Sequence, residues 1–136
     1  MPTELIAREA LPLDLFQQPA YAIVRPLWSL LGRVYRVYTP DGRLAMFVRR
    51  PFLRIRDRLI LFADEDETVP LLEIRNRSLL SFNMCHDVLD ALSGVRLGSV
   101  RSRGLSFMWR DAWDVLDPED RVCGSMQEDT LSLFRR

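Results

Sequence analysis

The chain has 136 residues, a length at which one domain can bury a core without disulfides or a structural metal. Its 19 basic residues balance its 19 acidic residues, so the overall charge gives no reason to expect nucleic acid or an anionic membrane as a partner, although local patches remain. All of these basic residues are arginine, and this uniform usage indicates a compositional bias rather than a choice of arginine for phosphate.

The N-terminal stretch lacks the features of a secretory signal or a membrane-spanning segment, because charged residues interrupt it and Arg25 breaks the apolar run that follows. Pro12 and Pro19 limit any helix here to a turn or two. We therefore expect residues 1–20 to be an N-terminal extension and residues 21–136 to form one domain. The expected location is the cytoplasm, with at most a peripheral association with a membrane.

Four segments share a pattern of large or apolar residues two apart, followed by a turn rich in Asp, Gly and Pro. This is the pattern of a strand that enters a hairpin. Their starts lie 24, 27 and 27 residues apart. The segments are YRVYTPDG from Tyr35, LILFADED from Leu59, HDVLDALSG from His86 and WDVLDPED from Trp113.

The residues after each turn repeat more strictly, at steps of 26 in three registers. A two-strand unit of this length is too short for a propeller blade, and it lacks the leucine-rich repeat signature. Consecutive hairpins with alternating faces predict instead an all-β fold, an antiparallel meander that curls into a barrel. The registers are Val48, Ile74, Val100 and Met126; Met46, Leu72, Gly98 and Gly124; and Arg49, Arg75, Arg101 and Gln127.

A row of arginines lies in the stretch RRPFLRIRDRLILF. Arg54, Arg56 and Arg58 lie two apart, so on a strand their side chains leave one face, and Arg49 and Arg50 come just before them. These five arginines have two interpretations. They bind the phosphate of an anionic lipid head group, or they keep one face of a sheet soluble and pair with acidic residues such as those of the DEDE turn.

The remaining reactive residues do not predict catalysis or a metal site. Cys85 and Cys123 lie far apart, and we expect both to be reduced and buried. His86 takes the place that Tyr35 and Trp113 have in other repeats, which favours a packing ring over a catalytic base. The acidic DEDE and DPED turns lack the EF-hand spacing, so turn formation is a better explanation for them than calcium binding. We expect no enzyme activity and no cofactor.

The order of these segments resembles the LURP-one-related and phospholipid scramblase group. The similar stretches are YRVYTPDGRLAMFV, RDRLILFADEDETVPLLEI, HDVLD with GVRLGSVRSR, and WRDAWDVLDPED with GSMQEDTLSLFRR. The resemblance covers about residues 21–136 and implies the tubby-like fold, a closed antiparallel barrel around an apolar helix. It also implies a basic surface for phosphorylated lipid, and it brings no catalytic signature.

The chain departs from that family in two ways. It shows only four clear hairpins, with a further strand pair between Tyr21 and Tyr38, and it ends at LFRR without the apolar helix. An unfilled barrel would expose inward-facing side chains at roughly 25 cal/mol per Å² of apolar area. We therefore expect a shortened chain, a partner or second copy that supplies the missing part, or a barrel that stays open. The calcium-binding segment and cysteine cluster of scramblases are missing too, which counts against scramblase activity.

The sequence thus predicts a non-enzymatic binding module. Its first candidate ligand is an anionic phospholipid at a membrane surface. The alternative is a scaffold for a protein partner, or a carrier of a small apolar molecule in the bore of the barrel. Nucleic acid is not expected, because the aromatic residues near the arginines are better explained as core. The residues predicted to bind the lipid are Arg49, Arg50, Arg54, Arg56 and Arg58.

Overall fold

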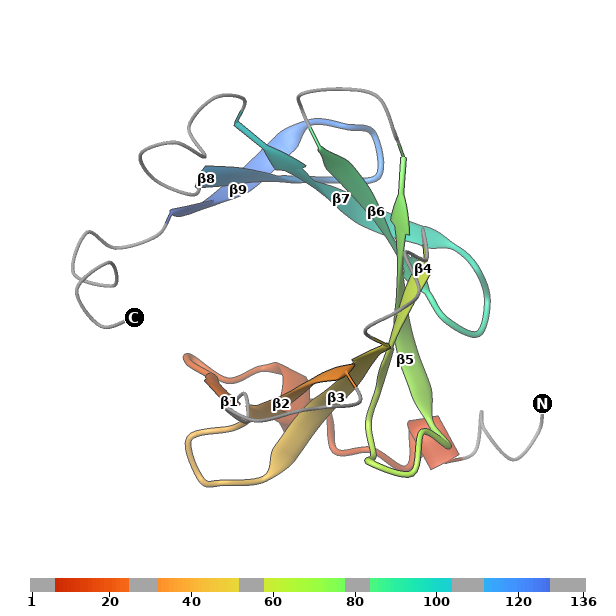
Figure 1. Ribbon diagram of the computed structural model, residues 1–136. Coiled ribbons are helices and arrows are strands. Elements are labelled where there is room, and N and C mark those ends of the chain that lie inside the picture. The colour runs from red at the N-terminus through yellow and green to blue at the C-terminus, as the bar shows by residue number, and fades with distance from the viewer. Residues whose placement is uncertain (1–6, 25–31, 52–57, 78–83, 104–111, 128–136) are drawn as a thin grey trace. The chain divides into compact units, whose positions relative to one another are not determined.

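The computed structural model describes residues 7–24, 32–51, 58–77, 84–103 and 112–127. In these residues the fold is all-β. Nine strands form one antiparallel meander sheet in which each strand lies beside the next in sequence, from β1 to β9 (Figure 1). This confirms the predicted meander of hairpins, including a first strand pair before Tyr38. Closure into a barrel remains a prediction.

The chain divides into two compact units, Met1–Glu73 with Ala91–Ser93, and Ile74–Asp90 with Gly94–Arg136. The division falls within β5 (Pro70–Asn76). The first unit includes residues before position 21, where the short helix η1 (Leu13–Phe16) supplies the expected helical turn. Leu15 of this helix is buried, and Asp14 pairs with Arg43 at 2.8 Å. This segment therefore packs within the first unit, to which Arg43 also belongs.

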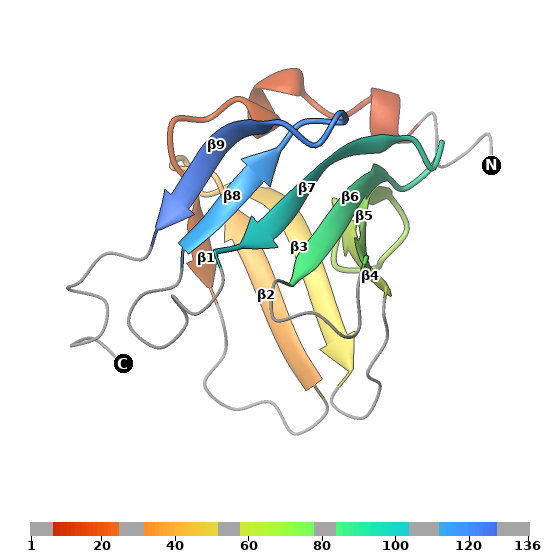
Figure 2. The same ribbon diagram turned by 90° about the horizontal axis from the view of Figure 1, so that it is seen from above.

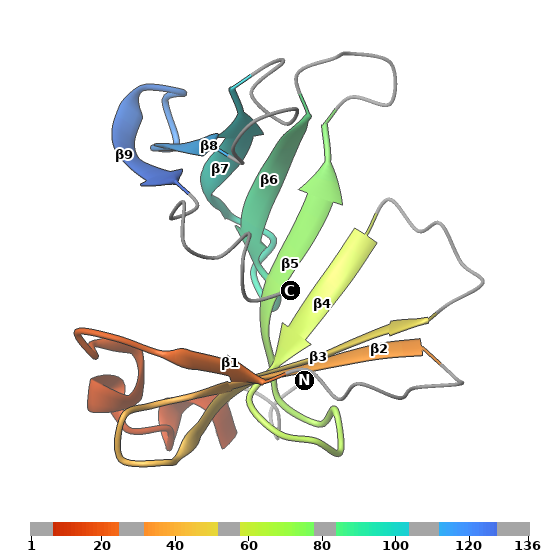
Figure 3. The ribbon, with the colours of Figure 1, turned by 60° about the vertical axis from the view of Figure 1, so that its left-hand side comes forward.

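The first unit contains β1 (Ala22–Val24), β2 (Gly32–Tyr38), β3 (Leu44–Pro51), β4 (Arg58–Phe62) and the start of β5. Strands β2 and β3 run side by side and are joined by the turn TPDGR (Figure 3). Because this turn needs a left-handed residue, glycine fits it, and Gly42 has a φ of +86°. The buried apolar side chains described in this unit are Leu15, Ala45, Phe47, Val48 and Leu71.

The second unit contains the end of β5, then β6 (Cys85–Asp90), β7 (Arg96–Ser102), β8 (Ala112–Leu116) and β9 (Val122–Gln127). Strands β6 to β9 lie side by side (Figure 2). His86 lies opposite Val100 and Trp113 lies opposite Met126. Tyr35 lies opposite Val48 in the same way, which confirms the place that the repeat gave to His86.

The sequence repeat is also a repeat of turn geometry. The structure describes the four turns that follow β2, β4, β6 and β8, and each of them contains one residue with a positive φ. Two of these residues are glycines and two are acids, and the acids must accept a conformation that side chains disfavour. The four are Gly42 (+86°), Glu67 (+59°), Gly94 (+71°) and Asp120 (+63°).

Candidate functional site

The predicted lipid-binding arginines do not all leave the same face of the sheet. Arg49 and Arg50 are neighbours near the end of β3, so their side chains leave opposite faces. Arg49 shares its face with Phe47, and Arg50 shares its face with the buried Val48. Arg58 begins β4, and Arg54 and Arg56 lie outside the described residues.

Two of the three described members of this set pair with carboxylates. Arg58 contacts Glu73 of β5, with Nε 2.7 Å from one carboxylate oxygen and Nη2 2.8 Å from the other. Arg49 lies 3.2 Å from Glu67, a residue of the DEDE turn. This is the pairing that the solubility interpretation predicted for these two residues. Arg50 is exposed, and no ion pair links it to a residue that the structure describes.

The face around Phe47 is closed by charged side chains. Phe47 is 1% exposed, and the guanidinium carbons of Arg36 and Arg49 lie 5.6 and 5.5 Å from the centre of its ring. Arg36 also donates two hydrogen bonds to Glu65, of 2.9 and 2.8 Å. The DEDE turn is therefore fastened to β2 and β3, and the two arginines cover an apolar ring while their charges are balanced.

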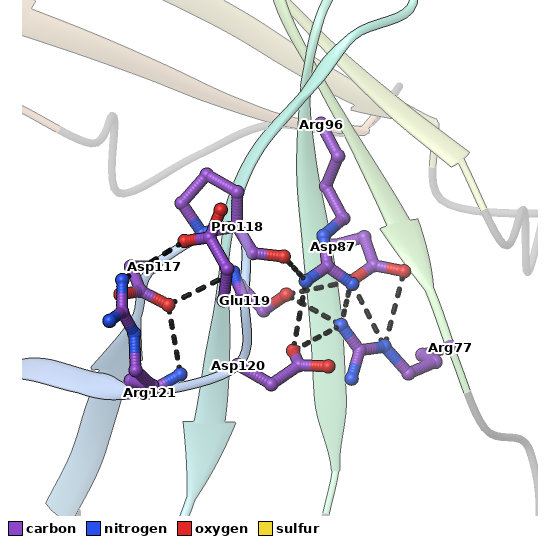
Figure 4. A network of polar contacts seen from close by, with 9 residues as sticks. Arg77, Asp87, Arg96, Asp117, Pro118, Glu119, Asp120 and Arg121 are labelled. Atoms are coloured by element: carbon purple, nitrogen blue, oxygen red, sulfur yellow. Dashed lines mark hydrogen bonds and ion pairs between the residues drawn. The ribbon is translucent and has the colours of Figure 1, made fainter.

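The second unit contains a denser network, which we call the Arg77 cluster: Arg77, Asp87, Arg96, Ser99 and Asp120 (Figure 4). Arg77 follows β5 and donates to Asp87 of β6 through Nε at 3.0 Å. Its Nη2 atom donates to Ser99 at 2.8 Å and to Asp120 at 2.9 Å. Arg96 of β7 reaches Asp120 at 3.0 Å and also donates to the carbonyl oxygen of Pro118.

Contacts within the Arg77 cluster shift the pKa values of its members. The hydrogen bond from Arg77 lowers the pKa of Asp87 below its ordinary value, and the hydroxyl of Ser99 adds to the effect, while burial opposes it. Arg77 likewise lowers the pKa of Asp120. In return, Asp87 and then Asp120 raise the pKa of Arg77. Arg77, Asp87 and Asp120 therefore stay charged at neutral pH, and the cluster contains equal numbers of arginines and aspartates.

The acidic residues between positions 112 and 127 pair with arginines of the same unit. Asp114 accepts from Arg103 at 2.6 Å and lies 3.4 Å from Arg101. Asp117 lies 2.8 Å from Arg121. This pairing limits how strongly the acidic residues can attract a basic partner.

The acidic turns use their carboxylates to hold their own backbone. Asp64 accepts hydrogen bonds from the backbone N–H groups of Thr68 (3.1 Å) and Val69 (2.9 Å). Asp117 accepts from the N–H groups of Glu119 (3.0 Å) and Arg121 (2.9 Å). Among the described residues, no three His, Cys, Asp or Glu side chains gather as a metal site would require. The geometry therefore fits turn formation.

Strands β6 to β9 have a second face, opposite the one that carries Asp87, Ser99 and Asp114. This second face is apolar and incompletely covered. Cross-strand partners place His86, Val100, Val115 and Trp113 on it. These side chains are only half-buried, and Met126 is 50% exposed. We define the apolar face as His86, Val88, Val100, Trp113, Val115 and Met126.

His86 and the two cysteines occupy different environments. The ring of His86 lies 6.2 Å from that of Trp113, centre to centre, as expected for a packing residue. Both cysteines are free; Cys85 is buried as predicted. The prediction was wrong for Cys123, which is exposed because β9 has exposed side chains on both faces.

The sequence analysis did not find the Arg77 cluster. The hydrogen bond between Arg77 and Asp120 joins residues 43 positions apart, so no local sequence pattern predicts it.

Within the parts of the chain that the structure describes, no helix has the length and apolar character needed to cross a bilayer. No family model, curated protein or solved structure matches the chain.

Proposed function

We propose that the chain is a non-enzymatic binding module whose apolar face in β6 to β9 binds a small apolar ligand. The observation that carries this proposal is the contrast between the two faces of the same strands. Arginine and aspartate side chains close one face by pairing, whereas the apolar face keeps valine, tryptophan and methionine side chains partly in water. Contiguous exposed apolar surface of this kind is typical of a binding surface.

The sequence resemblance supports the same proposal. In the LURP-one-related and scramblase-like group, to which the chain looks similar, the inner face of the barrel surrounds an apolar helix. In the proposal, the ligand covers apolar area that the helix covers in that group, and each Å² removed from water contributes about 25 cal/mol.

Two adjacent residues of β9 give a matched test. Met126 belongs to the apolar face, and Ser125 is also exposed but lies opposite Asp114 on the other face. We expect Met126→Glu to weaken binding of the neutral probe N-phenyl-1-naphthylamine several-fold, because a carboxylate resists transfer out of water. Ser125→Glu adds the same charge and should leave probe binding unchanged. Fluorescence titration measures both; equal effects of the two variants would exclude the apolar face. Native mass spectrometry would show any ligand retained through purification.

A second candidate is an anionic phospholipid head group bound by the arginines of β3 and β4, which would place the protein at a cytoplasmic membrane surface. Arg50 favours it, because this side chain is exposed and has no ion pair to a described residue. Flotation with vesicles of phosphatidylcholine, with and without phosphatidylserine, tests this candidate in wild type and in variants of its five arginines. Binding that ignores lipid charge would exclude it. The five are Arg49, Arg50, Arg54, Arg56 and Arg58.

A further inference from the structure

Two guanidinium groups of the Arg77 cluster converge on one carboxylate oxygen. Nη2 of Arg77 and Nη2 of Arg96 lie 2.9 and 3.0 Å from the same Oδ1 atom of Asp120 (Figure 4). Asp87 also contacts both arginines: Nε of Arg77 lies 3.0 and 3.2 Å from its two oxygens, Nη2 of Arg77 also donates to it, and Nη1 of Arg96 lies 3.8 Å from its Oδ1 atom. The side chain of Asp120 is 48% exposed, and those of Arg77 and Arg96 are 33% and 29% exposed. All three side chains are therefore partly open to solvent.

Asp120 occupies a backbone position for which glycine is the relaxed choice. The turns TPDGR and DPEDR align residue for residue, and Gly42 corresponds to Asp120. The same two backbone bonds close both turns. Gly42 donates to Thr39 at 2.9 Å and Asp120 donates to Asp117 at 3.0 Å, and the bond across the base of each turn is 2.9 Å. With a φ of +63°, Asp120 adopts a left-handed conformation and places its carboxylate between the arginines.

The charges show what would follow if Asp120 moved away. Asp87 supplies one negative charge against the two arginines, so the cluster without Asp120 keeps one net positive charge, and the N–H groups that faced Asp120 lose that acceptor. This arrangement suits an oxyanion, and a doubly charged phosphate group forms stronger charge-assisted bonds than a carboxylate does. A carboxylate on an exposed turn can be exchanged, because surface ion pairs are weak.

We propose that Arg77 and Arg96 form a clamp for a phosphate group, and that Asp120 is the internal ligand that fills the clamp until an external phosphate displaces it. The clamp lies in the second unit and shares no residue with the arginine row of β3 and β4. Its phosphate belongs to a soluble ion or to a lipid head group, two sources with the same chemistry at this site.

Asp120→Gly is the decisive variant, because glycine suits the turn and removes only the internal ligand. In calorimetric titrations of the full chain with inorganic phosphate, we expect this variant to bind about tenfold more tightly than wild type. Glu119→Ala removes an acid from the same turn and should not change phosphate affinity. The side chain of Glu119 is 65% exposed and, among the described residues, forms an ion pair with Arg121 alone. Adding Arg96→Gln to Asp120→Gly should abolish the gain.

The result that would overturn the clamp is equal phosphate affinity of wild type and Asp120→Gly, or a gain that survives Arg96→Gln. Circular dichroism spectra of each variant show that the strands are retained. Flotation of Asp120→Gly with phosphatidylcholine vesicles that contain phosphatidylinositol phosphate distinguishes the two sources. Flotation that inorganic phosphate competes away assigns the clamp to a head group, whereas phosphate binding without flotation assigns it to a soluble phosphate.

Discussion

Replacing Arg58 with methionine separates a structural role for this residue from the lipid-binding role that its place in the arginine row predicted. Arg58 contacts both oxygens of Glu73, at 2.7 and 2.8 Å, and the side chain of Glu73 is only 4% exposed. Methionine keeps most of the apolar stem but removes the charge. The substitution therefore leaves a buried carboxylate without its bidentate partner.

The expected loss follows from the burial of the two partners. Removing one partner of a fully buried ion pair costs about 3–5 kcal/mol. The side chain of Arg58 is 56% exposed, so water screens one side of the pair and we expect a smaller loss, about 2 kcal/mol in the free energy of unfolding. For a domain of this size, that loss corresponds to about 6–10 °C in Tm. Urea unfolding at pH 7, followed by tryptophan fluorescence, measures it.

Arg49→Met is the matched control from the same arginine row. Its pair with Glu67 is longer, at 3.2 Å, and the carboxylate is more open to water, since the side chain of Glu67 is 33% exposed against 4% for Glu73, so we expect a loss below about 1 kcal/mol. Adding Glu73→Gln to Arg58→Met should recover part of the stability, because a neutral amide is easier to bury than a carboxylate. Equal losses in the two arginine variants, or no recovery in the double variant, would refute the reasoning.

Two further predictions concern the second unit. Gly98→Ala should lower the free energy of unfolding in urea by about 2–3 kcal/mol, because the added Cβ would lie 2.4 Å from the carbonyl oxygen of Leu116. Gly124 has the equivalent position in the next repeat, and a Cβ there would have its nearest contact at 3.7 Å, so Gly124→Ala should change stability by less than about 0.5 kcal/mol. Similar losses in the two variants would contradict this contrast. Asp87→Asn should lower stability at pH 7, and its difference from wild type should shrink as the pH falls below 3.8. The folded pKa of Asp87 is depressed, so its contribution is present above the ordinary value of 3.8 and disappears as pH falls through the lower folded pKa; a difference from wild type that persists in acid would contradict this assignment.

Much of the strand architecture could be predicted from the sequence because its causes are local. Alternation of apolar residues every second position defines strands, and Asp, Gly and Pro at fixed intervals define turns. These signals predicted the hairpins that begin near Tyr35, Leu59, His86 and Trp113, and they placed His86 in a packing role. The 26-residue repeat of the sequence is also a repeat of strand pairing. Val48, Val100 and Met126 each lie opposite the aromatic or histidine residue of the preceding strand.

The partners of the charged side chains could not be predicted in the same way. The sequence shows Arg58 within an arginine row, but the strand pairing brings it to Glu73, and the turn after β8 brings Asp120 to Arg77. Such contacts depend on register and turn conformation over 15 and 43 residues, and the ion-pairing of a long side chain changes with every shift of register. The sequence alone determined that these strands have a wet side and an apolar side, because alternation is a property of the backbone. Only the tertiary structure decided that most described arginines on the polar side pair with acidic side chains, and that the apolar side of β6 to β9 stays half-covered. Burial and charge pairing depend on which strands become neighbours.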